Sequence, residues 1–96
     1  MIKYKKSPYY RIVTIADEYI AIPVGKNIPF KGVVALSEPA FFMLSYLDIL
    51  RSREELIEML MKEYDVGLSV VTIDLDNIIK TLLDIGLVEE CESDIG

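Results

Sequence analysis

The spacing of apolar residues changes once along this chain, near residue 36, and that change limits the folds open to it. Before it, β-branched and apolar residues alternate over residues 11–16 and 19–24, as in half-buried strands. After Ser37 the apolar residues recur at helical spacing as far as residue 85. Strands followed by helices are typical of α+β domains. We therefore expect an N-terminal three-stranded antiparallel sheet followed by three helices.

The first two expected strands are separated by Asp17 and Glu18, which is the spacing of a two-residue hairpin. This pair is not the favoured Asn-Gly or Asp-Gly, so the turn type stays open. A loop rich in turn-forming residues is expected over residues 25–31. The third strand should follow it as a short apolar run, made of Val33, Val34, Ala35 and Leu36.

The helices carry start and stop signals. Ser37 is a good N-cap for a first helix over residues 38–50, which is apolar nearly all round and should be largely buried. Ser52 and Glu55 form the S-x-x-E capping box of a second, amphipathic helix. Ser69 can cap a third helix over residues 69–85, and Gly86 suits its C-terminal end. Residues 89–96 are expected to form a frayed acidic tail.

Length and composition favour one domain over residues 1–96, with its core at about residues 8–90. The 96 residues are 52% hydrophobic and 27% charged, a composition that suits neither a disordered chain nor a membrane protein. No apolar run reaches the ~18 residues needed to span a bilayer. We expect a cytoplasmic protein that does not bind membranes.

The order of the elements resembles a winged helix-turn-helix with its sheet moved to the N-terminal side. The third helix would then be the recognition helix, but it carries Asp74, Asp76 and Asp84 against a single Lys80. Residues 41–96 as a whole hold four basic and thirteen acidic residues. Such a charge repels a phosphate backbone, so nucleic acid is not an expected partner. A winged-helix regulator that contacts DNA or another protein remains the alternative function.

Catalysis has no candidate residues. The chain has no histidine and one cysteine, Cys91, which is too few ligands for a zinc or iron–sulfur site. Cys91 also has no visible base that would activate it as a nucleophile. The chain has no Gly-rich phosphate loop or nucleophile elbow. We expect no enzymatic activity, no metal and no cofactor.

The third strand has two interpretations. At a sheet edge it would offer unpaired N–H and C=O groups to which an extended peptide adds as a further strand. It is otherwise a short structural strand that a loop covers. The residue pattern does not decide between them.

Several segments, in order, resemble one family. They are residues 32–40, Ser52-x-x-Glu55-Leu56, residues 63–66, and the third-helix run that ends Ile85-Gly86-Leu87-Val88. Together they resemble the PqqD-like family, named for the coenzyme PQQ synthesis protein D and also known as the RiPP recognition element. The resemblance covers about residues 8 to 90, and it depends on the order and spacing of these segments.

The resemblance implies a peptide chaperone that binds the leader of a ribosomally synthesised precursor peptide and presents it to a modifying enzyme, often a radical SAM protein. It implies that the leader adds to the third strand, at Val33, Val34, Ala35 and Leu36, and lies against the third helix. On a helical wheel we place the helix side of this peptide-binding site on the flank that carries Asp76, Ile79 and Leu83, with Lys80 at its margin. The flank with Asp74, Asn77 and Thr81 is the competing choice. A homodimer formed by exchange of elements also stays open.

Overall fold

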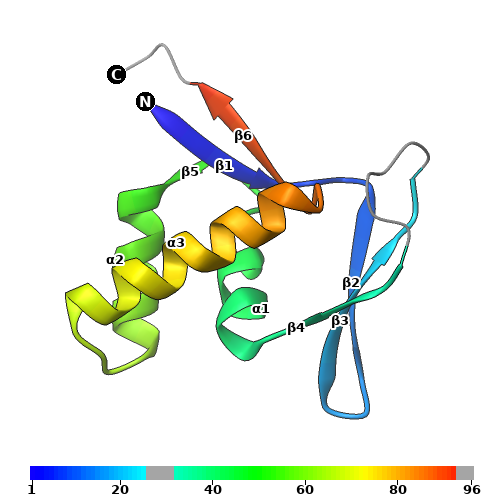
Figure 1. The fold of residues 1–96 in the computed structure, drawn as a ribbon, viewed down its shortest axis with the longest axis horizontal. Coiled ribbons are helices and arrows are strands. Elements are labelled where there is room, and N and C mark those ends of the chain that lie inside the picture. The colour runs from blue at the N-terminus through cyan, green and yellow to red at the C-terminus, as the bar shows by residue number, and fades with distance from the viewer. Residues whose placement is uncertain (26–31, 93–96) are drawn as a thin grey trace.

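The computed structural model describes residues 1–25 and 32–92, so most of the loop expected over residues 25–31 and the last four residues of the expected tail lie outside the described residues. The described residues form strands and helices in the order shown in Figure 1. The elements are β1 (Ile2–Lys6), β2 (Tyr10–Ile15), β3 (Glu18–Pro23), β4 (Val34–Leu36), α1 (Glu38–Ser45), β5 (Arg51–Ser52), α2 (Arg53–Glu63), α3 (Leu68–Asp84) and β6 (Val88–Glu92).

Two antiparallel sheets form within the described residues. One has the strand order β2-β3-β4 and the other has the order β5-β1-β6. In Figure 1 the first sheet lies to one side of the three helices, and β1 and β6 run along the top of the molecule. The predicted α+β fold, a three-stranded N-terminal sheet followed by three helices, is confirmed.

The hairpin between β2 and β3 turns one residue earlier than the sequence suggested. Ile15 pairs with Glu18, so the two loop residues are Ala16 and Asp17. Both have positive φ, 50° and 65°, as a type I′ turn requires. This turn matches the right-handed twist of the flanking strands, and the twist outweighs the unfavourable left-handed conformation of two residues with side chains.

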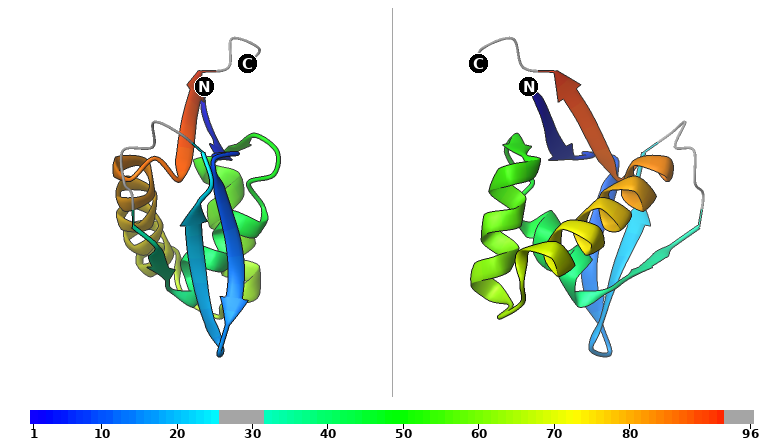
Figure 2. Two further views of the ribbon diagram at one scale, coloured as in Figure 1. Left: turned by 90° about the vertical axis from the view of Figure 1, so that its right-hand side faces the viewer. Right: turned by 60° about the vertical axis from the view of Figure 1, so that its left-hand side comes forward.

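The second sheet was not predicted. β1 pairs along its full length with β6, so the expectation of a frayed tail is wrong for residues 89–92. Lys5 lies opposite Glu89, and the N-terminal amine lies 2.8 Å from the Glu92 carboxylate. β1 alternates only over Ile2 to Lys5 and β6 is mainly acidic, so the strand signal is weak and the pairing becomes apparent only in the folded structure. Figure 2 shows the two strands side by side in both views.

α1 ends at Ser45, five residues before the predicted end at residue 50. Beyond Ser45 the backbone forms hydrogen bonds with β1. The Leu47 carbonyl accepts a hydrogen bond from the Lys6 N–H at 2.8 Å, and β5 pairs with β1. The Arg51 side chain donates to the Tyr46 carbonyl at 2.8 Å, which satisfies one of the free carbonyls at the helix end. Pairing with β1 therefore ends the helix, although the sequence remains apolar.

The other helix boundaries follow local signals more closely. The capping box at Ser52 and Glu55 is present, with both reciprocal hydrogen bonds. α3 begins earlier than predicted, with Gly67 and not Ser69 at its N-cap and with no side-chain hydrogen bond there. After α3 the chain reverses through Gly86, whose φ of 78° is the left-handed conformation expected at this position.

The core lies between the helices and the inner face of the hairpin. Leu44, Leu47, Leu75 and Leu87 have no exposed surface. Tyr19 of β3 stacks on Phe41 of α1, with ring centroids 3.9 Å apart, and this contact holds the first sheet against the helices. Within residues 1–25 and 32–92, no helix has the combination of length and apolar character that crossing a membrane requires.

Candidate functional site

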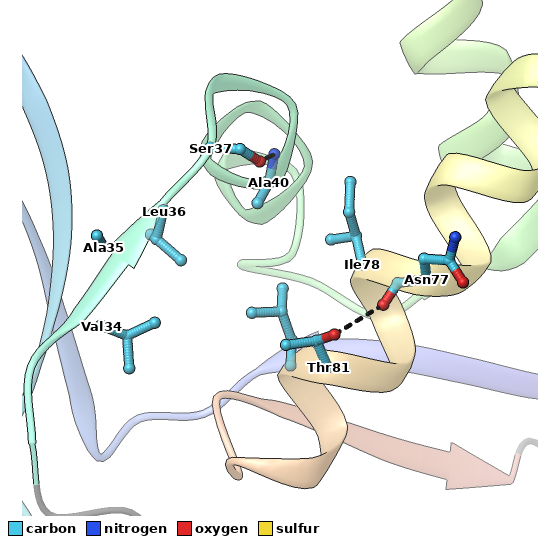
Figure 3. A pocket seen from close by; sticks show the side chains of 9 residues that line it. Val34, Ala35, Leu36, Ser37, Ala40, Asn77, Ile78 and Thr81 are labelled. Carbon is cyan, nitrogen blue, oxygen red and sulfur yellow. Dashed lines mark hydrogen bonds between the residues drawn. The ribbon is translucent and has the colours of Figure 1, made fainter.

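The short strand β4 is the edge of its sheet. It pairs with β3 on one side, where Ala35 lies opposite Ile20, and no described strand pairs with its other side. An edge strand presents backbone N–H and C=O groups along its free side. Helix α3 runs across from that side (Figure 3).

A groove of about 320 Å³ lies between β4, the start of α1 and the middle of α3. In Figure 3 the side chains of Val34 and Leu36 point toward α3, whereas Ala35 points away from it. Ile78 and Thr81 face the strand from the opposite wall. The lining residues are Val34, Ala35, Leu36, Ser37, Ala40, Asn77, Ile78, Thr81 and Leu82.

The walls of this groove are mainly apolar, with a few polar atoms. The Ser37 hydroxyl accepts from the Ala40 N–H at 3.2 Å, and the Thr81 hydroxyl donates to the Asn77 carbonyl at 3.0 Å. The Asn77 carboxamide makes no hydrogen bond within the described part of the chain. None of the described lining residues is ionisable. The groove is therefore suited to a ligand with apolar side chains and a backbone that can form hydrogen bonds. Its described lining residues include no acidic or basic side chain.

The structure places three of the four predicted strand residues in the groove. Val34, Ala35 and Leu36 form β4 and line the groove. Val33 precedes the strand, is 63% exposed and does not line the groove.

The predicted helix side lies elsewhere. Asp76 faces α2, where its two carboxylate oxygens accept from Arg53 at 2.7 and 3.0 Å. Ile79 is buried in the core, Leu83 packs against the core, and Lys80 is exposed outside the groove. The groove is instead lined by Asn77 and Thr81 of the competing flank, together with Ile78 and Leu82, which were expected in the core and not in the binding site.

The buried face of α3 differs from the one that helical spacing predicts at a single position. The spacing predicts an inner face of Val71, Leu75, Ile78 and Leu82, whereas the structure buries Val71, Leu75, Ile79 and Leu82. Ile78 is half-buried and lines the groove. Either isoleucine continues the apolar spacing, so the opposite charges of Arg53 and Asp76 are the further signal in the sequence.

The Arg53–Asp76 contact is the strongest electrostatic feature near the site. The hydrogen bond from the Arg53 guanidinium holds the pKa of the Asp76 carboxyl below its usual value. Both side chains are partly exposed, so solvent screens the pair. The contact joins α2 to α3 through a flank of α3 that does not line the groove.

No family model and no curated protein matches this chain. A solved structure described as TbiB1 in complex with the TbiA(beta) leader peptide is similar to it, with a TM-score of 0.72. The match covers 94% of this chain and 99% of that chain, at 22% sequence identity. This likeness shows that the two chains share a fold over nearly their whole length.

Proposed function

We propose that this chain is a peptide-binding module that captures the leader segment of a ribosomally synthesised precursor peptide by strand addition to β4. The observation that carries the proposal is the groove beside the free edge of β4, walled on the other side by α3. The fold shared with a protein whose structure is described as a leader-peptide complex supports it. So does the resemblance of the sequence to the PqqD-like family.

Strand addition suits the chemistry of the groove. Backbone bonds to the edge of β4 give affinity that does not depend on the peptide's sequence, and pockets for alternate side chains give selectivity. A strand added here directs every second side chain to the face of the sheet on which Val34 and Leu36 lie, toward Ile78, Thr81 and Leu82 of α3. Apolar residues at alternate leader positions are therefore expected to be preferred, and the Asn77 carboxamide is available for one polar contact.

The bound leader is then presented to a modifying enzyme, for which a radical SAM protein is our first candidate. The chain itself takes no part in the chemistry, an inference supported by the lack of ionisable side chains among the described residues of the groove. It works without a cofactor, in the cytoplasm, where precursor peptides are made. A homodimer formed by exchanged elements remains a proposal that size measurements with and without leader would test.

The deciding experiment is an amide NMR titration. The ligand is the leader of a short precursor peptide encoded beside this chain's gene, if possible next to a gene for a modifying enzyme. We expect the largest shifts at the amides of β4 and of residues 77–82. A leader that binds tightly but shifts only amides of the β2 edge or of the second sheet contradicts the assignment of the site. Salt-dependent binding of a DNA duplex, with no response to the leader, favours the winged-helix regulator instead.

A further inference from the structure

A second hollow lies beside the groove. It holds about 160 Å³ and lies where the start of α1, the end of α2 and the first half of α3 meet. Ile78 lines both the groove and this hollow, so the two spaces adjoin at that residue. Its lining residues are Pro39, Leu60, Tyr64, Val66, Val71, Asp74 and Ile78.

The direction of the chain decides which part of a bound peptide reaches this hollow. β4 runs from Val34 to Leu36 and leads directly into α1, whose second residue is Pro39 in the hollow's wall. All strand pairs of this sheet are antiparallel, and antiparallel pairing is slightly the more stable kind. A strand added antiparallel to β4 has its N-terminal end beside Leu36. The segment that enters the hollow is therefore the one just N-terminal to the strand-forming residues.

The hollow is apolar inside and acidic at its margin. Leu60 and Val71 are buried at its base, and Asp74 is exposed with no ion pair or hydrogen bond in the described part of the chain. The Tyr64 hydroxyl donates to the Glu38 carboxylate at 3.3 Å, which holds a second acid at the rim. Lys80, the lysine of α3, lies roughly 120° around the helix from Asp74 and does not neutralise it.

We propose that the peptide segment N-terminal to the added strand binds in this hollow, with one apolar side chain at its base and a Lys or Arg beside Asp74. The inference rests on the proposed function, because the segment reaches the hollow by way of β4. Its two supports are the position of the hollow beside the groove, with Ile78 in the wall of both, and the charge complementarity between Asp74 and a basic residue.

The test is a selection of random peptides displayed on phage, with the full chain as the immobilised target. The expected consensus has alternating apolar residues, preceded on the N-terminal side by an apolar residue next to Lys or Arg. The same selection is made with Asp74→Lys and with the matched control Asp84→Lys, which makes the same charge change on an exposed residue of α3 that lines neither space. Asp74→Lys should replace the basic preference with an acidic one, and Asp84→Lys should not.

Affinities of one selected peptide then give the size of the effect. We expect Asp74→Lys to weaken binding about tenfold at low salt, since an attraction becomes a repulsion. We expect replacement of the peptide's upstream apolar residue by Ala to weaken binding of the wild-type chain at any salt concentration. The peptide substitution keeps the test valid even if a protein variant is unstable.

The outcomes separate this inference from the proposed function. An alternating apolar consensus with no upstream preference, and equal affinities for Asp74→Lys and wild type, would leave strand addition standing and overturn the inference. Selection of no peptide, or of peptides that shift no amide of β4, would overturn both. The expected consensus with a loss confined to Asp74→Lys supports both.

Discussion

Thr81 is the groove residue at which binding is most easily separated from folding. It is exposed, and its hydroxyl bonds only to the Asn77 carbonyl one turn earlier. We expect Thr81→Tyr to fill the groove and to weaken leader binding at least about tenfold, while the free energy of unfolding changes by less than about 0.5 kcal/mol. Titration of a fluorescent leader and urea unfolding measure the two effects.

Lys80→Tyr is the matched control for this prediction. It adds the same ring at the next position, on an exposed residue outside the groove. Its affinity for the leader should equal that of the wild type. Equal losses at both positions, or no loss at Thr81→Tyr, would contradict the placement of the peptide between β4 and this flank of α3.

Asp76 lies on the flank of α3 that does not line the groove, so its substitution tests whether that flank takes part in binding. Asp76→Asn removes the charge that pairs with Arg53 but leaves the groove lining unchanged. Because the pair is partly exposed, we expect a fall in melting temperature of only a few degrees and no change in leader affinity. Calorimetry and leader titration check both. A large loss of affinity at Asp76, with none at Asn77→Ala, would return the helix side of the site to the flank first chosen from the sequence.

These residues show how far the sequence predicts the site. Residues 34–36 form a strand where the apolar run predicts one, because a short run directly before a capped helix leaves little freedom in its position, and they line the groove. Their role in peptide binding stays a prediction. The flank of α3 could not be fixed from periodicity, because either Ile78 or Ile79 can join Val71, Leu75 and Leu82 on the buried face. Burial of Ile79 and the Arg53 contact choose between them, and both are tertiary effects.

Among the elements, the β2–β3 hairpin holds its turn in an unfavourable local sequence. Ala16 and Asp17 both adopt positive φ, which costs about 1–2 kcal/mol for each residue that has a side chain, although Asp tolerates it better than Ala. We expect the double substitution Ala16→Asn with Asp17→Gly to raise the free energy of unfolding by about 1 kcal/mol, since Asn-Gly is the preferred pair for this turn. Urea unfolding of the double variant measures it. A decrease in stability would show that the turn is not of this type.

The elements also differ in how visible they are in the sequence. A capping box and an amphipathic repeat predict α2, and the helix forms where predicted. β1 and β6 are hard to recognise, because β1 alternates only over Ile2 to Lys5 and β6 is mainly acidic. The length of α1 also depends on β1. The Lys6 N–H at the end of β1 donates to the Leu47 carbonyl, and β1 pairs with β5. One unrecognised strand thus accounts for two errors, the frayed tail and the overlong first helix.

At the scale of the whole molecule, folding brings together the two ends of an unevenly charged sequence. Residues 1–40 carry six basic and three acidic side chains, whereas the rest of the chain is strongly acidic. β1 places Lys3, Lys5 and Lys6 in one strand, next to the acidic strand β6. The basic excess of the N-terminal part is therefore partly neutralised within the fold. The acidic surface that remains includes the hollow beside Asp74, which is consistent with selection of a basic peptide segment.

The same charges determine how the stability of the molecule depends on pH. Three carboxyls have a folded pKa lowered by a hydrogen bond, Asp48 from Lys6, Glu55 from the Ser52 backbone and Asp76 from Arg53. A lowered pKa means that the folded state binds the proton less readily than the unfolded state. The resulting stabilisation is fully present above the unfolded pKa values of about 4 and is lost as pH falls through the lower folded values.

We therefore expect the urea midpoint to stay nearly constant between about pH 7 and pH 5 and to fall below about pH 4. The triple variant Asp48→Asn, Glu55→Gln and Asp76→Asn should be less stable near neutrality and should lose less on acidification, so that its curve converges with that of the wild type at low pH. Gln at position 55 can still complete the capping box, so the comparison isolates the charges. High salt should narrow the difference, because the three carboxylates are exposed enough to be screened. Parallel curves for the two proteins would show that other groups control the acid unfolding.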